Sequence, residues 1–304
     1  MKISKRIISL LMAAMLVFGL PLSAFASDGG EIRIATAEDW KSFVKNCKLD
    51  TWSVGKTVVL DTDLDLGGSF TPVPVFSGTF DGNGHSIHIG SYTSAASDIG
   101  VFRYVSEGAV VKNLTVTGTW EPSGGKSAIG GIVGHNSGTI ENCMFNGVVA
   151  GKNNIGGIAG INENNGVITG CTVRGEIHGE HYTGGVAGQT LGSIIRCTNE
   201  SSVNTDGAEI APTLDDIDVT HINNTENLSV YTDTGGITGF SSGLLQGCQN
   251  TGEIGYPHVG YNVGGIAGRQ NGYLASCINR GEVQGRKDVG GIVGQMVPDI
   301  TLHF

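Results

Sequence analysis

A five-residue glycine phrase that occurs six times constrains the fold of this chain more than any other feature. The first copy is Gly130–Gly134 (GGIVG), and later copies begin at Gly156, Gly184, Gly235, Gly264 and Gly290. Successive copies start 26, 28, 51, 29 and 26 residues apart. Self-similarity at a period of about 20–50 residues is the signature of a repeat architecture. The chain is therefore predicted to be a stack of similar units.

Each unit repeats the same internal pattern. After the phrase at Gly130 come Ile140, Cys143 and Asn146-Gly147-Val148, and the unit at Gly264 continues with Leu274, Cys277, Asn279, Gly281 and Val283. Three short apolar stretches separated by glycine predict three strands and three bends per turn. The strands of one turn should pair in parallel with those of the next, about 4.8 Å away. We expect the phrase glycines to allow sharp corners and positive φ.

Two internal columns follow from this stacking. One should contain the third residue of each phrase: Ile132, Ile158, Val186, Ile237, Ile266 and Ile292. The other should contain the cysteines: Cys143, Cys171, Cys197, Cys248 and Cys277. Free cysteine packs as a small buried hydrophobe. Disulfides between neighbouring coils are the alternative, although parallel stacking aims both Cβ atoms the same way.

The N-terminus has the pattern of a secretory signal peptide at residues 1–26. Basic Lys2, Lys5 and Arg6 precede the apolar run 7–20, and Ala24-Phe25-Ala26 fits a cleavage site. The protein is thus predicted to be secreted, or associated with the cell surface, without membrane insertion. The chain has 18 basic and 28 acidic residues, which argues against a nucleic-acid partner.

Residues 27–55 are predicted to cap a β-helix formed by residues 56–304. Thr36 and Asp39 resemble a capping box, and a helix over 37–47 would present Trp40, Phe43, Val44 and Cys47 to the first coil. In the following strand, Leu60, Thr62, Leu64 and Leu66 should share one face and Asp61, Asp63 and Asp65 the other. That acidic face is either solvated or a calcium site, and no other cofactor is predicted.

The turn Asp81-Gly82-Asn83-Gly84 lies between two alternating strands and tolerates positive φ. Within the segment Phe76–Ile87 it resembles the first-coil signature of secreted bacterial proteins with GLUG repeats. That group includes the non-catalytic β-helical part of IgA-specific metallopeptidases. The segment Ile99–Phe102 and the glycine phrases are similar to the same family. The resemblance covers nearly everything from Ile34 onward. It implies an all-β, right-handed, single-stranded parallel β-helix with a role in adhesion or surface display.

The 51-residue spacing between two phrases indicates an acidic insertion at about 199–234. Residues 198–234 contain no Lys or Arg. Insertions in solenoids loop out of one face, which is often the binding face. The candidate binding residues are therefore Asp206, Asp215, Asp216 and Asp218, with a solvated acidic loop as the alternative.

No catalytic set is recognisable. Asn204-Thr205-Asp206 and Asp215-Asp216 resemble polygalacturonase motifs, but they start too close together to lie on adjacent coils. Glu176, His178 and His181 lack the His-Glu-x-x-His spacing of a zinc peptidase. The sequence therefore favours a non-enzymatic stalk or adhesion module for a host or cell-surface glycan or protein. A polysaccharide-degrading enzyme and a spacer of a larger surface peptidase remain as alternatives.

Overall fold

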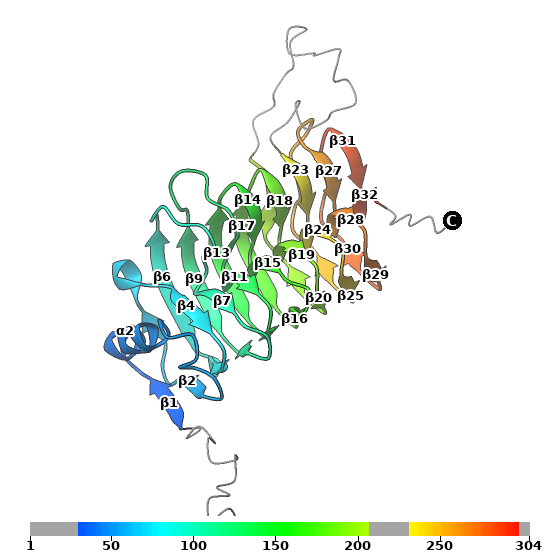
Figure 1. Cartoon of the computed structure of the whole chain (residues 1–304). Coiled ribbons are helices and arrows are strands. Elements are labelled where there is room, and N and C mark those ends of the chain that lie inside the picture. Colours follow the sequence, from blue (N-terminus) through cyan, green and yellow to red (C-terminus); the bar gives the residue numbers. More distant parts are fainter. Residues whose placement is uncertain (1–29, 207–230, 298–304) are drawn as a thin grey trace, which may run out of the picture.

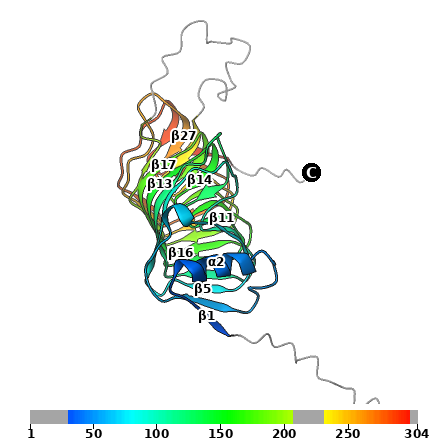
Figure 2. The ribbon, with the colours of Figure 1, turned by 90° about the vertical axis from the view of Figure 1, so that its left-hand side faces the viewer.

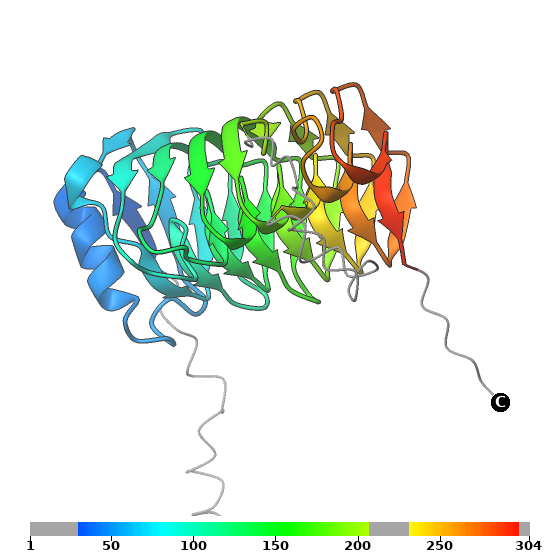
Figure 3. The ribbon, with the colours of Figure 1, turned by 90° about the horizontal axis from the view of Figure 1, so that it is seen from above.

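The computed structural model describes residues 30–206 and 231–297, and these residues form a parallel β-helix. Its turns stack along one axis, with helix α2 (Ala37–Asn46) at one end and strand β32 (Val293–Met296) at the other (Figures 1 and 3). Every pairing between named strands is parallel, and neighbours in a sheet come from successive turns. The predicted all-β solenoid with a short N-terminal helix is confirmed. The predicted signal peptide lies outside the described residues.

The strands form four sheets along the stack, labelled A to D. Sheet A contains β1 (Glu31–Ile34), β2 (Thr57–Leu60), β5 (Thr79–Asp81), β8 (Val110–Lys112), β12 (Thr139–Glu141), β16 (Val167–Thr169), β20 (Ser193–Ile195), β25 (Leu244–Gln246) and β29 (Tyr273–Ala275). Sheet B contains β3 (Leu64–Asp65), β6 (Ser86–Tyr92), β9 (Thr115–Trp120), β13 (Met144–Ala150), β17 (Thr172–His178), β21 (Thr198–Asn199), β22 (Ser202–Val203), β26 (Gln249–Asn250) and β30 (Ile278–Asn279).

The other two sheets meet at the glycine phrases. Sheet C contains β4 (Val73–Phe76), β7 (Phe102–Val105), β11 (Val133–Asn136), β15 (Ala159–Asn162), β19 (Ala187–Thr190), β24 (Thr238–Ser241), β28 (Ala267–Gln270) and β32. Sheet D contains β10 (Ile129–Gly130), β14 (Asn153–Gly156), β18 (His181–Gly184), β23 (Thr232–Gly235), β27 (Tyr261–Gly264) and β31 (Lys287–Gly290). A short 3-10 helix, η1 (Gly67–Ser69), precedes β4.

A complete turn has four strands, so the prediction of three was wrong. The turn that contains Gly130 runs through β10, β11, β12 and β13. Strand β10 ends at Gly130 and β11 begins at Val133, so the phrase is the corner between sheets D and C. The sheet D strand was missed because it ends in the first glycine of the phrase and shows no separate apolar stretch.

The phrase glycines allow the backbones of successive turns to approach closely, and they do not provide a positive φ. None of them has a positive φ, although other glycines of the described residues do. A Cβ atom added to Gly131 would overlap the Phe145 ring of its own turn and the Gly157 carbonyl of the next. The expectation of positive φ at the phrases was therefore wrong. The reason for glycine at these positions is the tight contact between turns.

Both predicted internal columns exist. The third phrase residues are fully buried from Ile132 through Ile266, whereas Ile292 is 37% exposed because no further described turn covers it. The cysteines are buried from Cys143 through Cys248, and Cys277 is partly exposed. All six cysteines are free, so the disulfide alternative is wrong. The Cys143 thiol instead donates to the Glu141 carbonyl at 3.3 Å.

The core also contains an amide ladder that the apolar pattern did not predict. The side-chain amide of Asn199 donates to Oδ1 of Asn250 at 2.8 Å, and Asn250 donates to Oδ1 of Asn279 at 2.8 Å. Asn279 thus lies in the same inward column as Phe145, while Asn146 is exposed on the outer face. The sequence alignment of Asn146 with Asn279 was off by one residue, which reverses the face.

Helix α2 covers the first turn of the stack (Figure 2). Thr36 and Asp39 form the predicted capping box. Trp40 and Phe43 are 0% and 2% exposed, and the Phe43 ring lies 5.9 Å from the Phe80 ring of the next turn. The helix begins as predicted at residue 37 and ends at Asn46. Strand β1, which precedes it within the predicted cap, already pairs with β2 as part of the β-helix.

The acidic strand after Lys56 is broken by a bend. β2 ends at Leu60 and β3 begins at Leu64, so Thr62 is exposed instead of sharing the buried face. Asp61 pairs with Arg33 at 2.7 Å, and Asp63 accepts a 2.7 Å hydrogen bond from the Ser86 N–H, which lowers the pKa of Asp63. Asp61 and Asp63 thus have separate partners.

The cysteine column predicts a specific alkylation pattern. Burial raises the pKa of Cys47 to about 12 and that of Cys171 well above its usual value, and the reactive species is the thiolate. In the native chain we expect N-ethylmaleimide to modify Cys277 at least about tenfold faster than the buried thiols. Peptide mass spectrometry after timed quenching would measure this. All six should react alike in guanidinium chloride, and equal native rates would contradict the buried column.

Candidate functional site

Of the four acidic residues proposed from the sequence, the structure places Asp206. Asp215, Asp216 and Asp218 lie outside the described residues. The predicted insertion of about 199–234 was too wide, because Ser202–Val203 and Thr232–Gly235 are strands of sheets B and D. The stack continues across the interruption, since β18 pairs directly with β23.

The turn His178–His181 holds both chain segments beside the undescribed residues 207–230. His178 Nδ1 lies 2.9 Å from Asp206 Oδ1, and His181 Nδ1 lies 2.8 Å from Thr232 Oγ1. His178 Nε2 lies 3.3 Å from Glu176 Oε2. The two carboxylates are therefore on opposite sides of the His178 ring and cannot bind one ion together with it. Within residues 30–206 and 231–297, no group of three His, Cys, Asp or Glu side chains could hold a metal.

A second candidate site, which was not predicted from the sequence, is a recess in the surface of the β-helix. The turns between sheets C and A have unequal lengths: residues 106–109 and 163–166 are long turns, whereas 137–138 between them is short. Every other such turn from β4 to β29 in the described residues is short, namely 77–78, 191–192, 242–243 and 271–272. The short turn between two long ones leaves a recess, which we call the notch.

The notch has a volume of about 490 Å³ and a polar lining. It is lined by Tyr104, Val105, Ser106, Glu107, His135, Ser137, Glu163, Asn164 and Asn165. Carboxylates, amides and hydroxyls dominate this list, and it contains no Lys or Arg. The volume is in the range of about 300–1,000 Å³ that small-molecule sites occupy.

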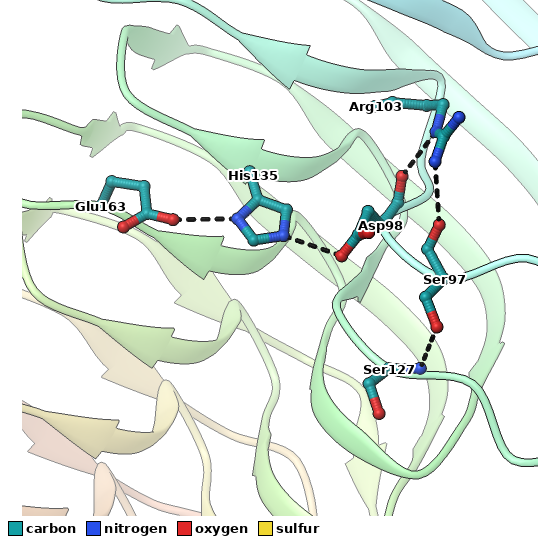
Figure 4. Close-up of polar contacts among 6 residues, drawn as sticks. All are labelled: Ser97, Asp98, Arg103, Ser127, His135 and Glu163. Atoms are coloured by element: carbon teal, nitrogen blue, oxygen red, sulfur yellow. Dashed lines mark hydrogen bonds and ion pairs between the residues drawn. The ribbon is translucent and has the colours of Figure 1, made fainter.

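His135 on β11 is fixed at the side of the notch between two carboxylates (Figure 4). Its Nδ1 lies 2.9 Å from Glu163 Oε1 and its Nε2 lies 2.9 Å from Asp98 Oδ1. The Tyr104 ring stacks on the imidazole with centroids 5.2 Å apart and planes 24° apart. Burial, followed by the charge of Asp98, raises the pKa of Tyr104. Because both ring nitrogens already have partners, His135 orients Glu163 and Asp98 and has no free nitrogen to act as a base.

Arg103 fixes the chain segment that carries Asp98. Its Nε donates to the Asp98 carbonyl at 3.1 Å and its Nη2 to the Ser97 carbonyl at 3.4 Å (Figure 4). The guanidinium carbon also lies 5.8 Å from the centre of the Tyr104 ring. The positive charge of Arg103 is thus used inside the framework and is not part of the notch lining.

A third polar cluster lies farther along sheets C and D. Arg269 on β28 pairs with the buried Asp233 at 3.3 Å, and its guanidinium carbon lies 5.7 Å from the Tyr182 ring and 5.1 Å from the Phe240 ring. The Asn262 amide donates to Asp233 at 2.9 Å. The pair is an ion pair without an aligned hydrogen bond, because Arg269 Nε has no hydrogen-bond partner. Burial raises the pKa of Asp233, although Arg269 and Asn262 oppose the shift.

The sequence contained one signal for the notch, which is the length of the turns. Measured between the apolar positions of successive units, the segments at 106–109 and 163–166 are two residues longer than the one at 137–138. The pairing of His135 with Asp98 and Glu163 could not be read from the sequence, because these residues come from three different turns.

The fold and the notch define a repeat protein in which a continuous β-helix presents a small polar recess on its side. Comparisons with known proteins agree with this class. The chain matches the family model of the GLUG motif over residues 125–150 and 151–177. It therefore contains GLUG repeats, as the resemblance indicated.

Two further similarities extend this finding. A 100-residue segment is 35% identical to Halomucin of Haloquadratum walsbyi (strain DSM 16790 / HBSQ001), covering 31% of this chain and only 1% of Halomucin. A crystal structure of a Bacteroides ovatus protein, provisionally described as an immunoglobulin A1 protease, covers 83% of this chain and 76% of that one. The TM-score is 0.53 at 19% identity, so this likeness shows the fold alone. None of the helices in the described residues is long and apolar enough to cross a bilayer.

Proposed function

We propose that this chain is an exported, non-enzymatic β-helix module that recognises a ligand at the cell surface. The signal-peptide pattern at residues 1–26 supports export. The GLUG repeats and the β-helical fold shared with the Bacteroides ovatus protein support a surface module. In this role the stack is a rigid spacer, and recognition takes place on its side.

The observation that carries the proposal is the notch with its fixed polar groups. The recess lies between two long turns on either side of a short one. Most of its hydrogen-bonding groups are on these turns, and one of them, Glu163, is held in place by His135 on strand β11. Such preorganised groups bind a ligand at a small conformational cost. The nitrogens of His135 are both paired with carboxylates, which favours binding over nucleophilic catalysis.

Export and surface binding can be tested separately. The full chain and a variant that lacks residues 1–26 would be expressed in a bacterial host, and culture medium, cell surface and cytoplasm would be probed by immunoblot. We expect the full chain outside the cytoplasm and the variant inside. The purified exported chain, labelled with a fluorophore, should then bind to intact cells in a saturable manner.

Two results would contradict the proposed function. One is retention of the full chain in the cytoplasm, or no saturable binding to bacterial or host cells. The other is release of reducing ends from a panel of uronic and neutral polysaccharides, abolished by Asp215→Asn or Asp216→Asn. That second result would support the polysaccharide-degrading alternative.

A further inference from the structure

We propose that the notch binds one uncharged sugar residue of a glycan and rejects anionic sugars. This inference rests on the proposed function, because it names the ligand class of the same site. Its basis is the shape of the notch, the chemistry of its lining and the fixed position of Glu163.

The shape suits a single ring. Neighbouring turns of the stack lie about 4.8 Å apart, so the two long turns, which are two turns apart, stand about 10 Å apart at their backbones. Side chains from both walls reduce this distance further, so the notch is narrow in this one direction. Ser137, in the short turn, lines the notch between the two walls. A ligand in the notch must therefore be narrow along the axis of the stack, and it can extend outward into solvent.

The lining matches sugar hydroxyl groups. Glu107 and Glu163 offer carboxylate oxygens that accept two hydrogen bonds each, as neighbouring hydroxyls can supply. Asn164 and Asn165 offer both donors and acceptors. Tyr104 is 37% exposed and provides an apolar edge for the C–H groups of a ring.

The charge of the lining decides between sugar classes. Two glutamates and no Lys or Arg face the notch, so a uronic, sialic or sulfated sugar would bring like charges together. The charge of a simple amine would be attracted to the two carboxylates. However, Glu163 already shares one oxygen with His135 at 2.9 Å, and the amides and hydroxyls outnumber the carboxylates. Hydrogen bonding rather than charge pairing therefore governs the site.

His135 prepares the wall of the notch for this ligand. It holds one Glu163 oxygen and leaves the other available, while the Tyr104 ring and Asp98 keep the imidazole in place. The side chain of Glu163 is 34% exposed, so it is accessible to a ligand and is also held by a partner. Because the Glu163 carboxylate is already held in one orientation, a ligand that binds it loses less conformational entropy.

The test uses the full exported chain and defined probes. Saturation-transfer NMR and calorimetry would be run with the methyl glycosides of glucose, galactose and mannose and with N-acetylglucosamine. Glucuronate, N-acetylneuraminate and butylamine serve as charged comparisons. We expect at least one uncharged sugar to bind with a dissociation constant on the order of millimolar, and glucuronate at least tenfold more weakly.

Two variants locate the binding. Ser137→Trp should fill the notch and weaken binding at least tenfold, and Glu163→Gln should weaken it several-fold. The matched control is Ser242→Trp, since Ser242 occupies the same position of a short turn whose neighbours are also short. It should leave binding unchanged. Circular dichroism and melting temperature would verify that each variant is folded.

Several outcomes would overturn the inference: no uncharged sugar of the panel binds, glucuronate or butylamine binds more tightly, or Ser137→Trp binds like the parent chain. If Ser137→Trp still binds intact cells, surface binding does not use the notch, so the inference fails while export and surface binding stand. If the chain binds a sugar in solution but is retained in the cytoplasm, the proposed function fails and the sugar site stands.

Discussion

Replacing Gly185 with alanine should destabilise the β-helix by about 3 kcal/mol or more, because the site has no room for a methyl group. Gly185 is the second glycine of its phrase. An added Cβ would lie closer than 3.0 Å to the Gly236 carbonyl of the next turn and to the Asn199 side chain of its own turn. A backbone carbonyl in a parallel ladder cannot retreat without breaking the pairing of β18 with β23.

The matched control is Gly291→Ala. Gly291 has the same place in the last phrase, but an added Cβ would meet nothing within 4 Å, since no described turn lies above it. Urea unfolding followed by circular dichroism would compare both variants with the parent chain. We expect a much lower midpoint for Gly185→Ala and nearly no change for Gly291→Ala. Equal midpoints for the two variants would show that close approach between turns is not the reason for these glycines.

The glycine phrase also shows which features of the fold can be predicted from the sequence. Its period predicted the stack, and the buried column from Ile132 to Ile266 followed, because parallel turns place equivalent residues over one another. The sequence did not show why glycine is needed, because a positive φ and a lack of space for a Cβ atom both select glycine. Only the register of Gly131 against Gly157 and Phe145 separates these two reasons.

Register also limited the prediction of the core and of the site. Asn279 lies two residues after Cys277, whereas Asn146 lies three residues after Cys143, and the single-residue difference places one inside and one outside. The acidic insertion is recognisable in the sequence because its composition is unusual. The notch has ordinary composition, and its geometry depends on differences in turn length between 106–109, 137–138 and 163–166. Composition finds unusual segments, but a recess between turns depends on their relative lengths.

Replacing Arg269 with methionine should destabilise the chain by about 3 kcal/mol at pH 7, because it leaves the buried Asp233 carboxylate without its cation. Methionine keeps an apolar side chain between Tyr182 and Phe240, so the loss of charge is the main change. The pKa of Asp233 is already raised by burial, and removal of Arg269 raises it further. A carboxyl group with a raised folded-state pKa stabilises the folded state below its unfolded pKa of about 4 and loses that contribution as the pH rises.

The pH dependence therefore distinguishes charge from packing. Relative to the parent chain at the same pH, the deficit of Arg269→Met should be less than about 1 kcal/mol near pH 4 and should grow toward pH 7. Adding Asp233→Asn should recover part of the loss at pH 7, since an amide keeps the bond from Asn262 without the charge. Arg280→Met, at an exposed arginine directly after β30, is the control and should change stability by less than about 0.5 kcal/mol. A deficit that is constant with pH, or that the double variant does not reduce, would mean that Arg269 acts by packing between the two rings rather than by neutralising Asp233.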